Sequence, residues 1–217
     1  MDTSLELIPQ SIVRHPAILK DAKRRKKKPG EMILDDSKHH SAMKSLEKKE
    51  KRGRPDIIHQ NLLLALDSTI KDLEIFIHTI NDEIIWINRE TRIPRNYYRF
   101  IGVMEDLFKK REIRANEKVL LKIMDANLES LLEDFKVLVL SERGDMGEDY
   151  MRSVFRSEDK IAVCIGAFPH GDFEDKTINI LRDHNADFVS LADRPLTSLY
   201  ITCKVLCIYE CERVRTD

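Results

Sequence analysis

The stretch KIAVCIGAFPHGDF, residues 160–173, decides the fold class. It opens with an apolar run that lacks the alternation of polar and apolar side chains, as is typical of a strand buried on both faces of a sheet. A loop containing Gly166 and Gly171 follows, and then a helical pattern, FEDKTINILR. This order predicts one strand–loop–helix unit of a parallel sheet packed between helices.

Two further segments repeat this order. KVLVLS at 136–141 and ADFVSL at 186–191 are apolar runs, and each precedes a helical pattern. The second half of the chain is therefore predicted to form a mostly parallel sheet in an α/β fold. The last helical pattern, at 195–212, is apolar around much of its circumference, and we expect it to be buried.

The first half follows a different pattern. Proline at the first helical position and helical spacing of apolar residues predict helices, and two β-rich runs around a short turn predict a hairpin. In chain order we expect a short strand at 5–9, a basic helix at 15–28, a short strand at 31–35, a helix from Pro55, a hairpin of strands at 73–79 and 83–88, and a helix over 94–111 that buries Phe100, Val103, Met104 and Phe108.

Composition predicts a soluble protein with a substantial core. Of 217 residues, 42% are hydrophobic and 35% are charged. No apolar run approaches the ~20 residues that a membrane-spanning helix needs, and no cleavable signal opens the chain, so we expect a cytoplasmic protein without a membrane partner.

Three of the four cysteines recur every four residues, at Cys203, Cys207 and Cys211. Helical neighbours at this spacing are badly placed for disulfides. The spacing also matches no zinc or iron–sulfur signature. We therefore expect small buried residues here, and no metal.

Charge is unevenly distributed along the chain. Residues 1–60 hold 15 lysines and arginines against 9 acidic residues, a net charge of +6 that leaves −7 for the remainder. The densest run is KDAKRRKKK, at 20–28. It is consistent with a solvated helix face and also with a patch that follows a nucleic-acid backbone.

Three loops follow the predicted parallel strands, at 140–144, 166–173 and 191–198. Ligands of open α/β sheets bind outside the carboxyl ends of the strands. Neither the dinucleotide fingerprint nor the P-loop pattern occurs. The loop at 166–173 has two interpretations, which can hold together: an ordinary turn in which Asp172 caps the next helix, or a ligand loop whose glycines allow close backbone approach.

Several long motifs carry a family resemblance. They are HPAILKDAKRRKKKP (15–29), LDDSKHHSAMKSL (34–46), EKRGRPDI (50–57), RIPRNYYRFIGVME (92–105), GAFPHGDF (166–173) and LADRPL (191–196). With these motifs in this order, the chain resembles the ribosomal-RNA pseudouridine N1-methyltransferases of the SPOUT, or α/β-knot, class, which are ribosome-biogenesis factors. DSKHHSAM and FPHGDF are closest to archaeal members.

The resemblance implies one knotted methyltransferase domain over residues 1–217, with a C-terminal trefoil knot and a homodimeric assembly. Basic N-terminal and hairpin elaborations, around 15–60 and 73–112, would bind RNA, and knot loops around 136–200 would bind S-adenosyl-L-methionine. Carried over to this sequence, the cofactor-binding residues are Leu140, Gly166, Gly171, Leu191, Ala192, Asp193, Arg194, Pro195 and Leu196.

The same resemblance assigns RNA binding to four arginines: Arg54, Arg92, Arg95 and Arg99. A planar guanidinium suits phosphates and base edges, and it can stack on an unpaired base. A helix beginning near Pro94 would place the last three on one face. Of Tyr97 and Tyr98, we expect one to pack inward and the other to be available for stacking on a base.

Asp56 has two candidate roles in catalysis. It could remove the proton from N1 of pseudouridine, or it could orient Arg54 through charge-assisted hydrogen bonds. A carboxylate beside an arginine is a weak base, so the orienting role is favoured. The implied activity is methylation of a pseudouridine in a small-subunit rRNA hairpin, within pre-ribosomal particles. The alternative is an rRNA-binding assembly chaperone in which catalysis is dispensable or absent.

Overall fold

The computed structural model describes residues 2–214 and contains the expected parallel sheet. Its three strands are β6 (Lys136–Leu140), β7 (Ile161–Ile165) and β8 (Asp187–Val189), in the order β7-β6-β8. Both pairings are parallel, so the prediction from the three apolar runs is confirmed.

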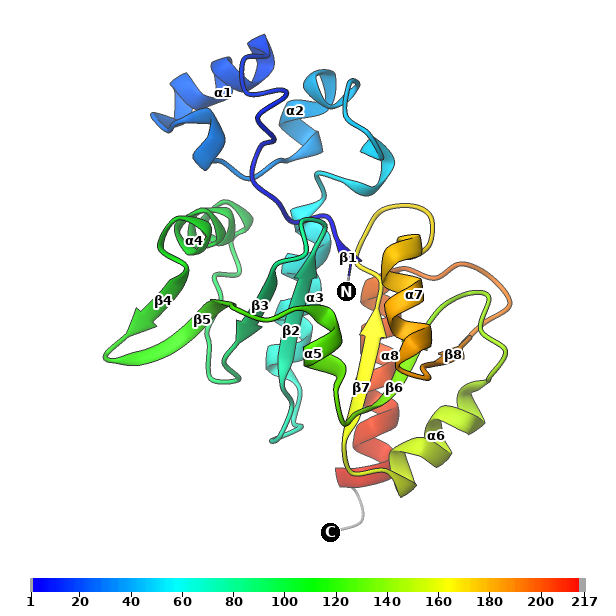
Figure 1. Ribbon diagram of the computed structural model, residues 1–217. Coiled ribbons are helices and arrows are strands. Elements are labelled where there is room, and N and C mark those ends of the chain that lie inside the picture. Colours follow the sequence, from blue (N-terminus) through cyan, green and yellow to red (C-terminus); the bar gives the residue numbers. More distant parts are fainter. Residues whose placement is uncertain (1, 215–217) are drawn as a thin grey trace.

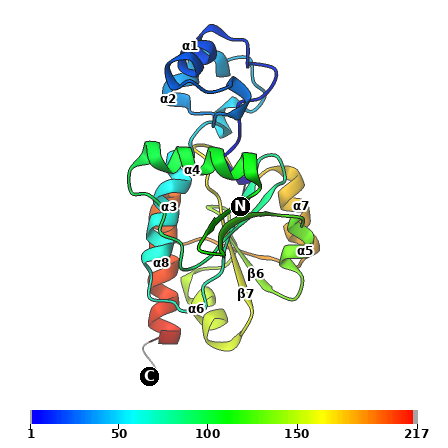
Figure 2. The same cartoon turned by 90° about the vertical axis from the view of Figure 1, so that its left-hand side faces the viewer.

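A helix follows each of these strands. They are α6 (Glu148–Ser157), α7 (Asp175–Asp183) and α8 (Ser198–Tyr209), and a π-helical turn, η3 (Glu210–Val214), extends the last one. Figure 2 shows α8 beside α3 (Pro55–Asp67) on one side of the sheets, with α7 and the short α5 (Leu128–Leu132) on the opposite side. The sheets thus form the middle of three layers (Figures 1 and 2).

A second sheet has five strands in the order β1-β2-β3-β5-β4. The predicted hairpin forms its centre and is antiparallel. Another antiparallel hairpin, not predicted from the sequence, pairs β4 with β5, whereas β1 pairs with β2 in parallel. The strands are β1 (Asp2–Thr3), β2 (Ile75–Thr79), β3 (Ile84–Ile87), β4 (Glu112–Ala115) and β5 (Lys118–Met124).

The first residues of the chain connect the two sheets. Thr3 forms an isolated parallel bridge with Ala167, which lies just beyond β7. The backbone N–H and the hydroxyl of Ser4 both donate to the carbonyl oxygen of Ala167, each at 3.2 Å. The loop after β7 is therefore fixed at its start by the N-terminal strand.

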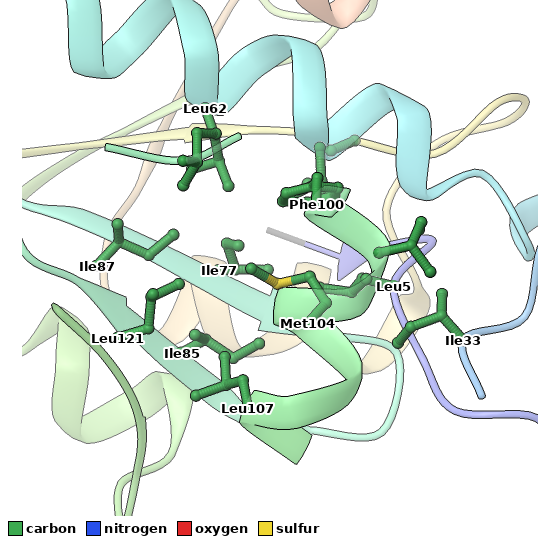
Figure 3. Packing of buried hydrophobic residues seen from close by; sticks show 14 of the residues in the cluster. Leu5, Ile33, Leu62, Ile77, Ile85, Ile87, Phe100, Met104, Leu107 and Leu121 are labelled. Atoms are coloured by element: carbon green, nitrogen blue, oxygen red, sulfur yellow. The ribbon is translucent and has the colours of Figure 1, made fainter. Parts of the chain in front are cut away.

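The largest core lies between the five-stranded sheet, α3 and α4 (Tyr97–Lys110). Figure 3 shows Met104 and Leu107 of α4 beside Ile77 and Ile85 of the sheet, and Phe100 close to α3. Phe100 and Met104 are fully buried, as predicted. Val103 and Phe108 are only half-buried, because they flank the apolar face of the helix rather than forming its centre.

The N-terminal helices form a unit with its own small core, above the sheets in Figure 1. Of the two strands expected at 5–9 and 31–35, only a single antiparallel bridge between Leu7 and Ile33 forms. The unit contains α1 (Pro16–Arg25), η1 (Pro29–Glu31), α2 (Asp36–Met43) and η2 (Lys49–Lys51).

Part of the basic run has a structural role. Arg25 donates to the carboxylate of Glu105 at 2.7 Å, and Lys27 forms an ion pair with the same carboxylate. Glu105 lies on α4 with its side chain 2% exposed, and its other oxygen accepts from the backbone N–H of Ile33. These contacts attach the N-terminal unit to α4.

The last helix is not buried all round. Its inward face consists of Thr202, Val205 and Ile208, whereas Cys203, Cys207 and Cys211 are exposed. The expectation of three buried cysteines is therefore wrong for the single chain. The stripe that they occupy is exposed in the single chain.

Candidate active site

The three loops after β6, β7 and β8 border one cavity of about 680 Å³. The carboxyl ends of adjacent parallel strands meet at one edge of a sheet, which explains why distant segments converge here. Eight of the nine expected cofactor-binding residues line the cavity, while Asp193 is exposed and is not among its lining residues. The eight are Leu140, Gly166, Gly171, Leu191, Ala192, Arg194, Pro195 and Leu196.

The two glycines of the loop at 166–173 lie against protein side chains. Gly171 has φ +88°, a conformation that residues with a Cβ rarely adopt, and a Cβ there would lie 3.2 Å from Cε of Lys51. A Cβ on Gly166 would lie 2.8 Å from the ring of Phe168. At both positions a neighbouring side chain occupies the space beside the glycine.

Asp172 does not cap α7, contrary to one of our two interpretations of this loop. The N-cap residue is Glu174. One oxygen of Asp172 accepts from the N–H of Phe173 at 2.8 Å, and the other lies 3.5 Å from the Ser141 hydroxyl. Asp172 therefore links two of the three cavity loops.

The segment 141–146 passes close to the end of β8. Ser141 N–H donates to Val189 O at 3.0 Å, and Ser190 N–H donates to Met146 O at 2.8 Å. A Cβ on Gly144 would lie 2.4 Å from the carbonyl carbon of Val189, so only glycine fits this crossing. Sequence reasoning missed Gly144, because a close approach between backbones has no local signal.

The fourth wall of the cavity comes from α3. Arg54, just before this helix, donates through Nε and Nη2 to the two oxygens of Asp56, both at 2.8 Å. These hydrogen bonds raise the pKa of Arg54, so its guanidinium is held in the charged form. Gln60 also lines the cavity; it was missed, although it lies one helical turn after Asp56.

The cavity suits the nucleoside and amino-acid parts of S-adenosylmethionine. Apolar side chains that could enclose an aromatic base come from Leu140, Ile165 and Leu191. Hydroxyl and carboxylate groups line it as well, at Ser141, Asp172, Ser190 and Thr197. Such groups can recognise ribose hydroxyls and an ammonium group.

The arginines at 92, 95 and 99 are all exposed, but they do not share a helix face. The helix begins at Tyr97, because the side chain of Asn96 accepts from the N–H of Arg99 at 3.1 Å. Arg92 borders a second hollow, beside Arg89 and Glu90.

The segment before α4 is attached to α3 through His59. His59 Nε2 lies 2.7 Å from the carbonyl oxygen of Pro94, and its ring stacks on Phe100 with centroids 4.4 Å apart. Arg95, next to Pro94, pairs with Asp67 of α3 at 3.1 Å. One helix therefore supports both the Arg54–Asp56 pair and the segment that carries Arg92 and Arg95.

Tyr97 and Tyr98 differ in burial, as expected. The hydroxyl of Tyr97 donates to Asp35 at 2.9 Å, and burial raises the pKa of this phenol. Tyr98 is 65% exposed. The ammonium of Lys38 lies 4.5 Å from the centre of the Tyr98 ring, a cation–π distance.

Among residues 2–214, no three His, Cys, Asp or Glu side chains are grouped in a way that could hold a metal ion. In the same part of the chain, no helix combines the length and the apolar character that crossing a bilayer requires.

Comparison with known proteins assigns the family. Residues 1–210 match the family model described as EMG1/NEP1 methyltransferase. The chain belongs to the EMG1/NEP1 methyltransferase family. The resemblance seen in the sequence motifs is thus confirmed.

Two relatives within the EMG1/NEP1 family match over nearly their whole length. The ribosomal RNA small subunit methyltransferase Nep1 of Archaeoglobus fulgidus is 53% identical over 215 residues, which cover 99% of this chain and 94% of the relative. The protein of the same name from Saccharolobus solfataricus is 41% identical over 206 residues, covering 94% of this chain and 92% of the relative.

The fold of the EMG1/NEP1 family is also matched in three dimensions. The crystal structure of Archaeoglobus fulgidus Nep1 bound to S-adenosylhomocysteine superimposes with a TM-score of 0.93. The two chains are 52% identical, and the match covers 98% of this chain and 96% of the other.

Proposed function

We propose that this protein is an S-adenosyl-L-methionine-dependent methyltransferase that methylates N1 of a pseudouridine in a hairpin of small-subunit ribosomal RNA. The observation that carries the proposal is that the Arg54–Asp56 pair borders the same cavity as the loops after β6, β7 and β8. A candidate RNA-binding group and the candidate cofactor loops therefore share one site. The Archaeoglobus fulgidus relative is named as a small-subunit rRNA methyltransferase, and its crystal structure contains S-adenosylhomocysteine, which supports the same function.

Bound S-adenosylmethionine would supply an activated methyl group. Leu140 and the loop from Leu191 to Leu196 would enclose the cofactor. Asp193 of this loop lies outside the cavity, so it would contribute less to cofactor binding. Enclosure would exclude water and fix the direction in which the methyl group faces the target nitrogen. Alignment alone can lower the activation barrier for methyl transfer by up to roughly 7–11 kcal/mol.

Arg54 would hold the target nucleotide and stabilise the negative charge that develops on the base. Its guanidinium retains donors beyond the two used on Asp56, since arginine has five N–H groups. In this account Asp56 orients Arg54, and the general base, if the reaction uses one, is a separate group. Arg92, Arg95 and Arg99 would bind the flanking RNA, with Tyr98 stacking on an unpaired base.

We further propose that residues 1–217 act as one knotted domain and that two copies form a homodimer. Support for the knot comes from the crossing of residues 141–146 with the end of β8, where Gly144 meets the backbone of Val189. Support for the dimer comes from the exposed stripe of α8, on which Leu199 and Tyr200 continue the line of cysteines. A second copy, packed about a two-fold axis, would cover this stripe.

The natural setting would be the cytoplasm, on pre-ribosomal particles. A direct test is incubation of the protein with labelled S-adenosylmethionine and a small-subunit rRNA hairpin, followed by mass spectrometry of the nucleosides. We expect a methylated pseudouridine, and no product when uridine replaces pseudouridine in the same hairpin. No product, together with no calorimetric binding of S-adenosylhomocysteine at millimolar concentration, would instead support the assembly chaperone.

A further inference from the structure

The side chain of Lys51 connects the N-terminal unit to the cofactor loop after β7. Its ammonium donates to the carbonyl oxygen of Asp172 and pairs with Glu174 at 3.3 Å. It also lies 5.1 Å from the centre of the Phe168 ring. The Lys51 side chain is only 16% exposed, so these contacts replace most of its hydration.

These contacts fall on the part of the loop that borders the cavity. Phe168 lies between Lys51 and Gly166, because its ring is the nearest neighbour of a Cβ built on that glycine. Lys51 itself is the nearest neighbour of a Cβ built on Gly171. One lysine thus supports both glycines of the loop, directly at one and through Phe168 at the other.

A second lysine strengthens the same connection at its outer end. Lys48 pairs with the other oxygen of Glu174, and the two lysines lower the pKa of that carboxylate. Lys48 is about half exposed, whereas Lys51 reaches the loop backbone. Lys51 is therefore the specific contact, and Lys48 is a more solvated one.

From Lys51 the chain reaches Arg54 through a short and strongly fixed segment. Arg52 donates to both oxygens of the buried Glu6, at 2.7 and 2.6 Å. Gly53 has φ +70°, and a Cβ there would lie 2.8 Å from Cε of Met43. Arg54 is held by Asp56. The segment is therefore rigid, and it holds Lys51 and Arg54 in a fixed relative position.

We propose that Lys51 is a positioning residue that couples RNA binding to cofactor binding, by holding the loop at 166–174 in its binding conformation. The proposal rests on the function proposed above and adds the route between its two ligands. Because such coupling is reciprocal, bound RNA tightens the cofactor, and bound cofactor tightens the RNA by the same factor.

The test is titration calorimetry of S-adenosylhomocysteine, with and without a saturating pseudouridine hairpin, on the full-length protein. For the unmodified protein we expect the hairpin to tighten ligand binding by about fivefold or more, the lower end of typical coupling. Lys51→Met should weaken ligand binding about tenfold and reduce the coupling factor to near one. Lys51→Arg, which keeps the cation and its donors, should restore the coupling.

Lys49→Met is the matched control, because it removes the same charge from the same turn at an exposed position. It should leave both the affinity and the coupling unchanged. Hydrogen exchange should accelerate at residues 166–174 in Lys51→Met and stay unchanged in Lys49→Met. If Lys51→Met proves unstable, Glu174→Gln weakens the same contact from the other side and should reduce the coupling in the same direction.

Coupling in Lys51→Met equal to that of the unmodified protein would overturn the proposal. An unmodified protein that binds the ligand equally well with and without the hairpin would also overturn it. Absence of ligand binding by the unmodified protein is a different outcome, since it contradicts the proposed methyltransferase function itself.

Discussion

Arg54 and Asp56 are joined by two parallel hydrogen bonds of 2.8 Å, with only Pro55 between them in the chain. Pro55 is the first residue of α3, so the pair sits where a rigid helix begins. Such geometry fixes the direction of the guanidinium. Asp56 is thereby suited to orienting Arg54 at the edge of the cavity.

Replacing Asp56 by Asn distinguishes its two candidate roles. We expect RNA affinity to fall by about 1–3 kcal/mol, because the amide offers one acceptor and Arg54 loses its fixed direction. Binding of S-adenosylhomocysteine should stay unchanged. Asp106→Asn, at an exposed helical ion pair with Lys110, is the control. Normal RNA binding with a collapsed rate of methyl transfer would identify Asp56 as the base.

Replacing Arg95 or Arg99 by Ala should weaken the cognate hairpin by about 1–3 kcal/mol. A plot of the logarithm of the binding constant against the logarithm of the salt concentration should have a slope shallower by about one if a phosphate contact is lost. Fluorescence anisotropy at several salt concentrations measures both effects. Arg114→Ala, at an exposed pair with Glu112 on the β4–β5 hairpin, should bind as the unmodified protein does. Unchanged binding in both test variants would mean that these arginines are solvated surface residues that do not contact the RNA.

Replacing Gly171 by Ala should weaken binding of S-adenosylhomocysteine about tenfold. The left-handed backbone at φ +88° costs a residue with a Cβ roughly 1–2 kcal/mol, so the loop would shift to relieve it. Gly147→Ala is a suitable control, because φ is −103° and a Cβ there meets nothing within 4 Å. Calorimetry on both variants is the measurement, and equal affinities would show that the loop tolerates the change.

Light scattering should give a mass of about twice 25.4 kDa at micromolar concentration. Tyr200→Glu, on the exposed stripe of α8, should shift the protein toward the monomer, because a charge is costly to bury in an apolar interface. Leu19→Glu changes a similarly exposed apolar residue on α1 and should leave the mass unchanged. A fully active monomer would count against the proposed dimer.

The N-terminal unit should lose stability in mild acid. His39 is fully buried between α1 and α2, and burial lowers its pKa from the ordinary value of 6.5, although Asp21 and Asp35 face it. The unfolded chain therefore binds more protons just below pH 6.5. The free energy of unfolding falls as the pH falls through that window. His39→Gln should flatten this dependence in chemical denaturation.

The sequence predicted the elements whose patterns are local. Apolar runs at β6, β7 and β8 identified the parallel sheet because the central strand β6 is buried on both faces and its neighbours β7 and β8 are at least half-buried. The β4–β5 hairpin was missed because its turn residues, Asn116 and Glu117, both have positive φ without the glycine that usually marks such a turn. Tyr97 starts α4 because Asn96 provides a cap, which outweighs the proline two residues earlier.

For the site, motif resemblance located residues that pattern reasoning alone would not have brought together. The carboxyl ends of the strands indicated three loops, but not that α3 would form another wall with Asp56 and Gln60. The cysteines of α8 were misjudged for a related reason. An apolar stripe has the same sequence pattern whether it faces the core of its own chain or a partner.

The pairing of Ser4 with Ala167 has a consequence for how the chain is made. The two sheets are joined here by residues 163 positions apart in the chain, so this connection can form only after both segments have been made. On the ribosome, the N-terminal strand emerges long before Ala167 is synthesised, so the strand lacks this partner through most of translation. Contacts this distant in sequence form late and slow folding. We therefore expect closure of the sheets, rather than formation of the helices, to set the pace at which this enzyme matures.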